Sequence, residues 1–392
     1  MLTLEHNQLV VRFPEIHPDA VCTISFQRTL RIPDDNRVHN LPPSLGNFPL
    51  AHVDDHAAKL PAAWQKRGGI FLPMHETEAM WVRFHSKYPF AVKIAAGKIN
   101  AVTGKPWTAE LSGPRTVGPA FAQGQVCAGR VCSDYNSQVF GSGIQNPYLS
   151  DTLARYGRTN EEQDYLSVPK QPWLDGFCVG KGKVRQFVAM PLGEGYTAEE
   201  QITGEALHGG LQIIVYPIRP EFYRPPQPPR FHASGAMANG GGVLRSMSMN
   251  ATFSGATAKS ASADLGMAPG GLMEQTIHQD QNDVSQYDQS RSAKCFVHLL
   301  NSAQYQMVTG RVPPHAAPTA ADYTRAGLPW FKEWNVGANA LDGGKPLKGL
   351  DSVANLGNKK GETPLPENAP LPPNAKLPFI VKNPNEVVNG DW

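Results

Sequence analysis

The chain of 392 residues is long enough for two or three domains, and its 41% hydrophobic content predicts at least one large core. Its 36 basic and 34 acidic residues leave a net charge of +2 without a basic run, so we expect no nucleic-acid partner. No apolar run reaches the roughly 18 residues of a spanning helix, so no transmembrane segment is expected. The start of the chain lacks a signal-peptide pattern, which predicts a soluble, cytoplasmic protein.

The five cysteines indicate a reducing compartment, because an odd number scattered over a long chain does not suit a disulfide framework. Cys127 and Cys132 form the one close pair. Four residues separate them, and no second Cys or His pair is near, so free thiols are favoured over a zinc site.

The first hundred residues predict short strands and turns, in keeping with 37 Gly and 35 Pro in the chain. Apolar and polar residues alternate up to about residue 56, and a short helix is expected from Asp54 or Asp55 through Trp64. Alternation returns over 79–84. A hairpin is expected around Gly97 and Lys98.

The stretch from Asp164 to Pro217 predicts the core of the molecule, since it reads as strand, turn, strand, short helix, strand. The apolar run 184–190 has strand length. Thr197 can cap the helix, with Glu200 completing a capping box and Gly204 ending it in a left-handed turn. Residues 211–216 then form the last strand of the stretch.

After Pro217 the composition changes to a proline-rich segment and then to a Gly, Ala, Ser, Met and Asn tract over 233–263, which predicts a linker. Regular structure is expected to return at Gly266. The expected elements are strands over 273–280 and 294–300, a helix over 301–308, and a helix opened by Pro318 and Thr319 and ended by Gly327.

These elements predict a mainly β protein with a few short helices, of the α+β class, with two sheet-based lobes joined by a Pro/Gly/Ser-rich linker. The central stretch is expected to pack on the N-terminal region. The predicted regions are 1–118 (N-terminal, β-rich), 119–163 (irregular insertion), 164–218 (central α+β stretch), 219–265 (linker), 266–357 (C-terminal α+β region) and 358–392 (irregular tail).

Several long blocks resemble an uncharacterised family of bacterial and fungal proteins whose members often carry the label "integral membrane protein". The matching blocks include VRFPEIHPDA (11–20), FQRTLRIPDD (26–35), LPMHETEAMW (72–81), QPWLDG (171–176), VRQFVAMPLGEGYTAEEQITG (184–204) and AGLPWF (326–331). Hydropathy gives the membrane label no support. The resemblance implies no catalytic residues, and the tract over 233–263 departs from the family pattern.

The candidate metal ligands are His75, Glu76 and Glu78 in LPMHETEAMW. On a strand the two glutamates would share one face, where they could bind a divalent cation or divide acid and base roles, while His75 would point to the other face. The ordinary alternative is a half-buried strand with solvated polar residues.

Two further clusters have simpler explanations than metal binding. His52 and His56 are spaced for one face of a helix, but Asp54 or Asp55 is better read as a helix cap. His278, Asp280 and Asp283 fit an exposed strand followed by an Asx turn.

Aromatic residues beside Pro and Gly give a candidate ligand site at Trp173, Asp175 and Trp330, although packing of a tight turn is the commoner role. The helix start in GEGYTAEEQ could hold an anion, but Glu199 and Glu200 already occupy its positive end. The sequence has no G-x-S-x-G elbow, P-loop or H-E-x-x-H motif.

The sequence therefore favours a soluble, non-catalytic binding or assembly protein, with homo-oligomerisation as one way to cover open sheet edges. The rival is a metal-dependent enzyme that uses His75, Glu76 and Glu78, with His208 or His278 as further ligands. A divalent metal is the cofactor that this rival implies. Peripheral membrane association is a third hypothesis, which the near-zero net charge disfavours.

Overall fold

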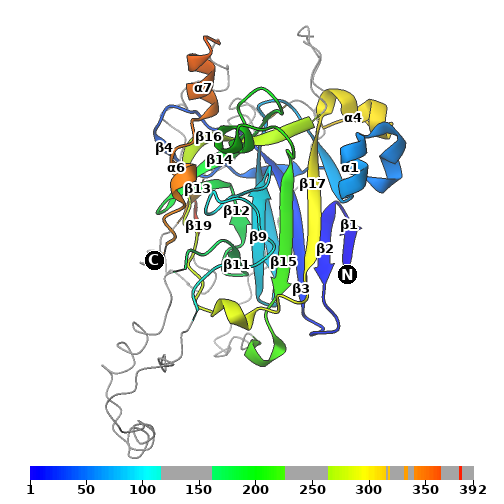
Figure 1. The fold of residues 1–392 in the computed structure, drawn as a ribbon, viewed down its shortest axis with the longest axis vertical. Coiled ribbons are helices and arrows are strands. Elements are labelled where there is room, and N and C mark those ends of the chain that lie inside the picture. Colours follow the sequence, from blue (N-terminus) through cyan, green and yellow to red (C-terminus); the bar gives the residue numbers. More distant parts are fainter. Residues whose placement is uncertain are drawn as a thin grey trace, which may run out of the picture.

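The computed structural model describes residues 1–115, 161–225, 264–314, 317, 331–333, 340–362 and 379–381. Strands dominate these ranges and the helices are short (Figure 1). The expected mainly β, α+β class is thus confirmed. No helix in the described ranges is both long and apolar enough to cross a membrane.

Seventeen strands join in one hydrogen-bonded sheet, in which most pairs are antiparallel. They are β1 Leu2–Glu5, β2 Gln8–Arg12, β3 Val21–Thr29, β4 Val38–His39, β5 Ser44–Asn47, β6 Ala51–His52, β7 Ile70–Met74, β8 Ala79–Ser86, β9 Phe90–Ala96, β10 Ile99–Asn100, β11 Leu166–Val168, β12 Trp173–Leu174, β13 Gly176–Gly180, β14 Lys183–Pro191, β15 Leu211–Pro217, β16 Asp264–Glu274 and β17 Ala293–Asn301. A separate parallel pair consists of β18 Phe331–Glu333 and β19 Phe379–Val381.

The helices of the described ranges flank the sheet. They are the 3₁₀ helices η1 Asp54–Lys59, η2 Pro220–Phe222 and η3 Val284–Gln286, and the α-helices α1 Ala62–Arg67, α3 Ala198–Thr203, α4 Ser302–Thr309, α6 Lys345–Lys348 and α7 Val353–Lys359.

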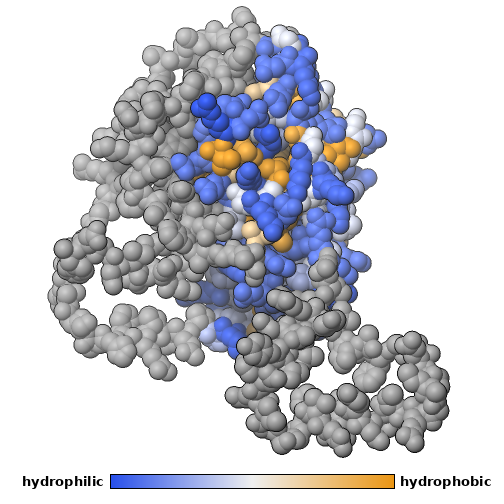
Figure 2. Space-filling model, turned by 90° about the vertical axis from the view of Figure 1, so that its left-hand side faces the viewer, coloured by the Kyte–Doolittle hydropathy of each residue, from blue (hydrophilic) through white to orange (hydrophobic). Residues whose placement is uncertain are grey.

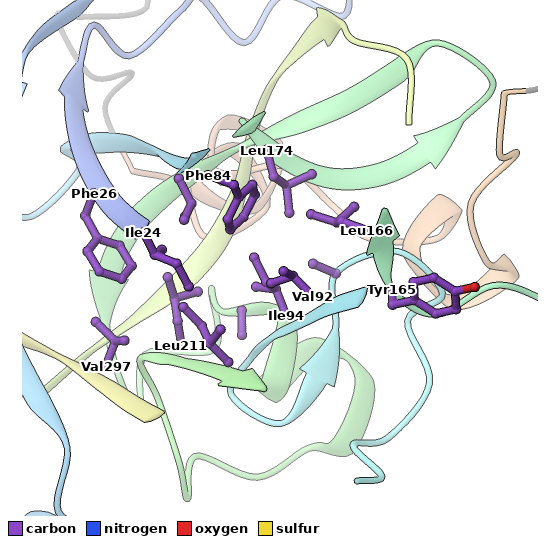
Figure 3. Close-up of a cluster of buried hydrophobic side chains, with 14 of the residues drawn as sticks. Ile24, Phe26, Phe84, Val92, Ile94, Tyr165, Leu166, Leu174, Leu211 and Val297 are labelled. Carbon is purple, nitrogen blue, oxygen red and sulfur yellow. The ribbon is translucent and has the colours of Figure 1, made fainter. Parts of the chain in front are cut away.

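The sheet has two parts that face each other across the core. One part runs β1, β2, β3, β8, β14, β16, and the other runs β7, β17, β15, β9, β11. The two parts join where the start of β16 pairs with the end of β17. Side chains of β3 and β8 meet those of β9, β15 and β17 in one buried cluster (Figure 3). Burial of this apolar surface is the main source of stability.

The two expected lobes share one sheet in the described ranges, in contrast to a pair of separate sheets joined by a linker. β17, from the predicted C-terminal region, pairs with β15 of the central stretch and with β7 of the N-terminal region. β16 pairs with β14. Without these partners β14 and β15 would expose unpaired backbone groups at sheet edges, which is unfavourable. The domain boundaries drawn from the sequence stay a prediction.

The predicted helix at Thr197 is confirmed in detail. Thr197 Oγ1 accepts a hydrogen bond from Glu200 N at 3.2 Å, and Glu200 Oε2 accepts one from Thr197 N at 3.1 Å. Gly204 ends α3 with a left-handed φ of 77°. Local sequence chemistry therefore determines this element.

The predicted hairpin over Gly97 and Lys98 is also confirmed, with φ values of 56° and 63° at the two turn positions. These left-handed values suit the right-handed twist of β9 and β10. The expected helix from Asp54 through Trp64 is wrong, because it is split into η1 and α1. Pro61 stands between them, and a proline disfavours helical geometry in the residue before it.

The expected strand over 273–280 lies too far along the chain, since β16 spans Asp264–Glu274. The strand could not be recognised from the sequence because it contains glycines and Pro269. They serve close packing: a Cβ at Gly271 would lie 2.4 Å from the Pro33 carbonyl oxygen, and one at Gly266 would lie 2.6 Å from Thr197 Cγ2. Glycine in a strand commonly marks such an approach.

The expected strand over 294–300 and the helix after it are confirmed as β17 and α4. The expected helix at Pro318, residues 119–160 of the insertion, and the tract over 233–263 lie outside the described residues. One face of the surface is mostly hydrophilic where it is described, with small hydrophobic areas (Figure 2).

Candidate functional site

His75, Glu76 and Glu78 lie in the turn between β7 and β8, not on a strand as expected. Thr77 has a left-handed φ of 65°, so the alternation that would place both glutamates on one strand face does not apply. The turn sends the three side chains to different partners. Glu76 Oε1 accepts from Asn301 Nδ2 at 2.9 Å, and His75 Nε2 lies 3.1 Å from the Pro314 carbonyl oxygen.

Glu78 is buried and paired with Arg28. Its Oε1 lies 2.6 Å from Arg28 Nη2, and its Oε2 accepts from the His75 backbone N at 2.9 Å. Burial raises the pKa of Glu78 above its ordinary value, and the charge of Arg28 offsets part of this rise. Within the described ranges no three His, Cys, Asp or Glu side chains form a group that could hold a metal ion.

His52 and His56 do not share a helix face, because His52 lies in β6 and His56 in η1. The His56 ring instead packs edge-on against Phe71, at 5.6 Å between centroids. The residue before η1 is Val53, so neither Asp54 nor Asp55 is its N-cap.

Trp173 and Asp175 belong to a buried network tied to the C-terminal part of the chain. Asp175 Oδ2 accepts from Gln275 Nε2 at 2.7 Å, and Asp175 N donates to Gln275 Oε1 at 3.0 Å. Trp173 is half-buried and packs against the core. Trp330, the third candidate ligand residue, lies outside the part of the chain whose side chains are described.

Asp280 is the centre of a second buried network. Its Oδ2 accepts from the hydroxyls of Tyr287 at 2.6 Å and Tyr165 at 3.0 Å, and its Oδ1 accepts from Ser167 Oγ at 3.0 Å. Burial, with the Asp280 charge, raises the pKa of both tyrosines far above the ordinary value. This network joins β11 to the segment after β16.

The other two residues of that cluster point elsewhere. Asp283 is the N-cap of η3, accepting from Ser285 N at 2.8 Å, so the expected Asx turn is present here. The backbone N of His278 donates a hydrogen bond to Gln171 Oε1 at 3.0 Å. Burial lowers the pKa of its imidazole, and Lys170 lowers it further.

The strongest candidate for recognition is a group of cations on the outer face of β9, β15 and β17, which lie side by side in Figure 1. Arg67 ends α1, Lys98 lies in the β9–β10 hairpin, His208 precedes β15, and Lys294 lies on β17. With Phe296 and Trp107 beside them, these residues are called the cationic patch below.

The strand register places Lys294 and Phe296 on this outer face. Ile214 pairs with Lys294 and Lys93, and Gln212 pairs with Phe296 and Ala95, so these residues form adjacent cross-strand rows. The intervening row of Ile213, Cys295 and Ile94 faces the core. Alternation along β17 therefore separates the patch from the apolar interior.

Aromatic rings and backbone carbonyls hold two of the cations in place. Arg67 lies over the Phe296 ring at 5.2 Å, and its Nη2 donates to the Leu207 carbonyl oxygen at 2.8 Å. Lys98 Nζ lies 5.6 Å from the centroid of the Trp107 ring. Cation–π contacts of this kind contribute about 0.5–2 kcal/mol.

Residues 105–112 form a strap across the outer face and position Trp107. Trp107 N donates to the Lys98 carbonyl oxygen at 2.8 Å. Buried Lys93 fastens the strap, since its Nζ donates to the Glu110 carbonyl oxygen at 2.6 Å and to Asp164 Oδ2 at 2.6 Å. The Tyr216 hydroxyl donates to the Ala109 carbonyl oxygen.

Glu199 holds the loop that carries His208. This buried carboxylate accepts hydrogen bonds from the backbone N of Leu207 at 3.0 Å, of His208 at 2.8 Å and of Gly209 at 2.8 Å. Gly97 packs so closely on Glu199 that a Cβ there would lie 2.4 Å from Oε2. Glu199 thus fixes the loop against the hairpin. Glu199 lies with Glu200 in the first turn of α3, as expected from the sequence, but its carboxylate accepts hydrogen bonds from the loop.

Carboxylates near the patch act on it through their charge, Asp264 on Arg67 and both Glu199 and Glu205 on His208. Arg67, Lys98 and Lys294 form no ion pair with a carboxylate in the described ranges. Burial lowers the pKa of Lys98, and Arg67 and Lys294 lower it further. Burial also lowers the pKa of His208; Arg67 and Lys98 act in the same direction, and Glu199 and Glu205 oppose them.

The Phe296 ring, over which Arg67 lies, belongs to a stack of three rings. His298 lies between Phe296, at 4.3 Å between centroids, and Trp64, at 4.2 Å. His298 Nε2 lies 3.1 Å from the Gly68 carbonyl oxygen, and burial lowers its pKa to about 4. The stack supports Phe296, which in turn supports Arg67.

Sequence reasoning missed the patch because its cations stand at positions 67, 98, 208 and 294 and form no run. The available signals were conformational: Lys98 follows Gly97 in a turn, and His208 precedes Gly209 and Gly210. Neither signal indicates that the side chains of Lys98 and His208 belong to one patch. No family model, curated protein or solved structure matches this chain.

Proposed function

We propose that this protein is a non-catalytic binding protein whose ligand is a negatively charged molecule held at the cationic patch. The observation that carries the proposal is that Arg67, Lys98 and Lys294 come from three separate elements to positions around Phe296, where none of them forms an ion pair with a carboxylate of the described ranges. Cations gathered in this way repel one another and destabilise the unliganded fold. A negatively charged ligand would remove that repulsion and gain attraction from all three.

The framework around the patch supports a binding role because it is already ordered. Glu199 fixes the His208 loop with three hydrogen bonds, and the strap holds Trp107 against Lys98. A ligand that enters a preorganised site has less conformational entropy to remove, so more of the interaction energy appears as affinity.

Three buried carboxylates in the described ranges favour binding over catalysis, because other side chains already hold them. Glu78 is held by Arg28, Asp175 by Gln275, and Asp280 by two tyrosines. Burial raises the pKa of the Cys22, Cys178 and Cys295 thiols to about 12, which keeps them protonated and poorly nucleophilic.

The proposal is tested by calorimetric titration of the full chain with sulfate at constant ionic strength. Lys294→Gln removes one exposed cation of the patch, and Lys87→Gln makes the same change at an exposed position near the other end of β9. One charge contact at about 4 Å in water contributes about 1 kcal/mol, so Lys294→Gln should weaken binding roughly fivefold. Lys87→Gln should leave it unchanged. Sulfate binding that is undetectable, or equal in both variants, would overturn the proposal.

A further inference from the structure

Resting on the proposed function, we infer that the ligand of the cationic patch is a small oxyanion with two or more negative charges, of the phosphoryl class. Inorganic pyrophosphate and compact phosphate esters belong to this class. The inference depends on the number of cations, on their spacing, and on what already covers the aromatic rings.

The number and spacing of the cations indicate a compact, multivalent ligand. Arg67 lies over the Phe296 ring, and Lys294 lies two residues before Phe296 on the same face of β17. Lys98 N donates to the side chain of Gln212, the residue that pairs with Phe296, so the three cations come from positions around one ring. A phosphoryl group places close to two charges on one tetrahedral centre and offers three strong acceptor oxygens. A single carboxylate carries one charge and matches three cations less well.

The types of cation also suit phosphoryl oxygens. Arginine presents a planar fork of donors that matches phosphate geometry, and lysine acts as a mobile point charge. Arg67 Nη2 donates to the Leu207 carbonyl oxygen at 2.8 Å, and Nη1 donates to the His208 carbonyl oxygen at 3.3 Å. Arg67 Nη2 also lies 3.4 Å from His208 Nδ1. These contacts fix the plane of the guanidinium, and its Nε–H and the second N–H of Nη1 remain for a ligand.

The aromatic rings of the patch hold cations and do not offer a stacking surface. Arg67 lies over the Phe296 ring, and His298 stacks on the same ring. Both Lys98 and Lys93 lie within 6 Å of the Trp107 ring, at 5.6 and 5.7 Å. Recognition therefore depends on charge, and a flat aromatic ligand has no advantage here.

The partial burial of the patch favours a small ligand over a membrane surface. Arg67, Lys98 and His208 are half-buried, and the first two are pinned by rings and carbonyls. Attraction to anionic lipid headgroups usually comes from clusters of exposed, flexible lysines. The same phosphoryl chemistry occurs in both settings, so the experiment must separate them.

The inference is tested by calorimetric titration of the full chain with acetate, sulfate and pyrophosphate at constant ionic strength, near pH 8, where acetate carries one negative charge, sulfate two and pyrophosphate about three. We expect each added charge to tighten binding roughly fivefold, which corresponds to about 1 kcal/mol per charge contact. Lys294→Gln should lose more affinity for pyrophosphate than for sulfate, and Lys87→Gln should match the wild type for both.

The outcomes separate the inference from the function on which it rests. If acetate binds as tightly as pyrophosphate, and Lys294→Gln weakens both equally, the ligand class is wrong while anion binding at the patch stands. If no anion binds, both fail. A sedimentation assay with phosphatidylcholine vesicles, with and without phosphatidylserine, forms the second arm. Sedimentation that requires phosphatidylserine and is not displaced by pyrophosphate would overturn the small-ligand inference.

Discussion

Acidification should destabilise this protein through His298, which is buried on β17. Its ring stacks on Trp64 and Phe296, and burial lowers its pKa from 6.5 to about 4. Arg67 lowers the pKa as well, whereas the hydrogen bond to the Gly68 carbonyl raises it. The folded state therefore favours the neutral ring. The unfolded chain takes up the proton first as the pH falls.

The sign and the size of the effect follow from these two pKa values. The stabilisation is fully present above 6.5 and is lost as the pH falls from 6.5 toward 4. At about 1.4 kcal/mol per pH unit, the full loss approaches about 3 kcal/mol, of which about 2 kcal/mol is gone by about pH 5. Losses of this size are a large fraction of the stability of an ordinary domain.

The assay is urea denaturation of the wild type and of His298→Phe between about pH 7.5 and pH 5, the range that brackets the loss. Phenylalanine keeps the stack but cannot titrate, and it loses the Gly68 hydrogen bond at a cost of about 1 kcal/mol at neutral pH. Carboxylates affect both proteins alike, so the difference between the two curves isolates His298. The wild type should lose about 2 kcal/mol more than the variant by about pH 5. Parallel pH profiles would refute the reasoning.

Three further substitutions test the contacts that hold the fold and the patch. Glu199→Gln replaces an acceptor oxygen by a donor facing the backbone of residues 207–209, so urea denaturation should show a loss of about 1–3 kcal/mol; calorimetry should show weaker pyrophosphate binding, and unchanged binding would remove Glu199 from the account. Glu78→Gln removes the carboxylate that lies 2.6 Å from Arg28 Nη2 and should cost about 1–3 kcal/mol in urea denaturation, because a charged hydrogen-bond acceptor is lost from a buried site; a loss below about 0.5 kcal/mol would contradict the buried pair. Thr197→Ala removes the cap of α3 and should lower the melting temperature by an amount that corresponds to about 1 kcal/mol.

Elements with strong local chemistry could be predicted from the sequence. The capping box of Thr197 and Glu200 and the turn at Gly97 and Lys98 are confirmed because their geometry depends on a few neighbouring residues. β16 could not be placed, because its glycines reflect packing against distant segments such as Pro33. Local pattern carries no information about such contacts.

The candidate site shows the same limit more strongly. His75, Glu76 and Glu78 are adjacent in the sequence, yet the turn at Thr77 sends them to separate partners. Arg67 and His208 are far apart in the sequence, yet Arg67 Nη2 lies 3.4 Å from His208 Nδ1. Sheet pairing brings the patch together. A site of this kind becomes visible when the register of β9, β15 and β17 is known.

The central claim, that the patch gathers cations for an anionic ligand, is tested most directly by the titration of Lys98. Reductive methylation with ¹³C labels each lysine for NMR, and loss of a resonance in Lys98→Asn assigns Lys98. In the free protein Lys98 should titrate below its ordinary value of 10.5, and saturating pyrophosphate should raise its pKa. The Lys87 resonance should not respond to pyrophosphate. A Lys98 that titrates at its ordinary value and does not respond to pyrophosphate would contradict the account.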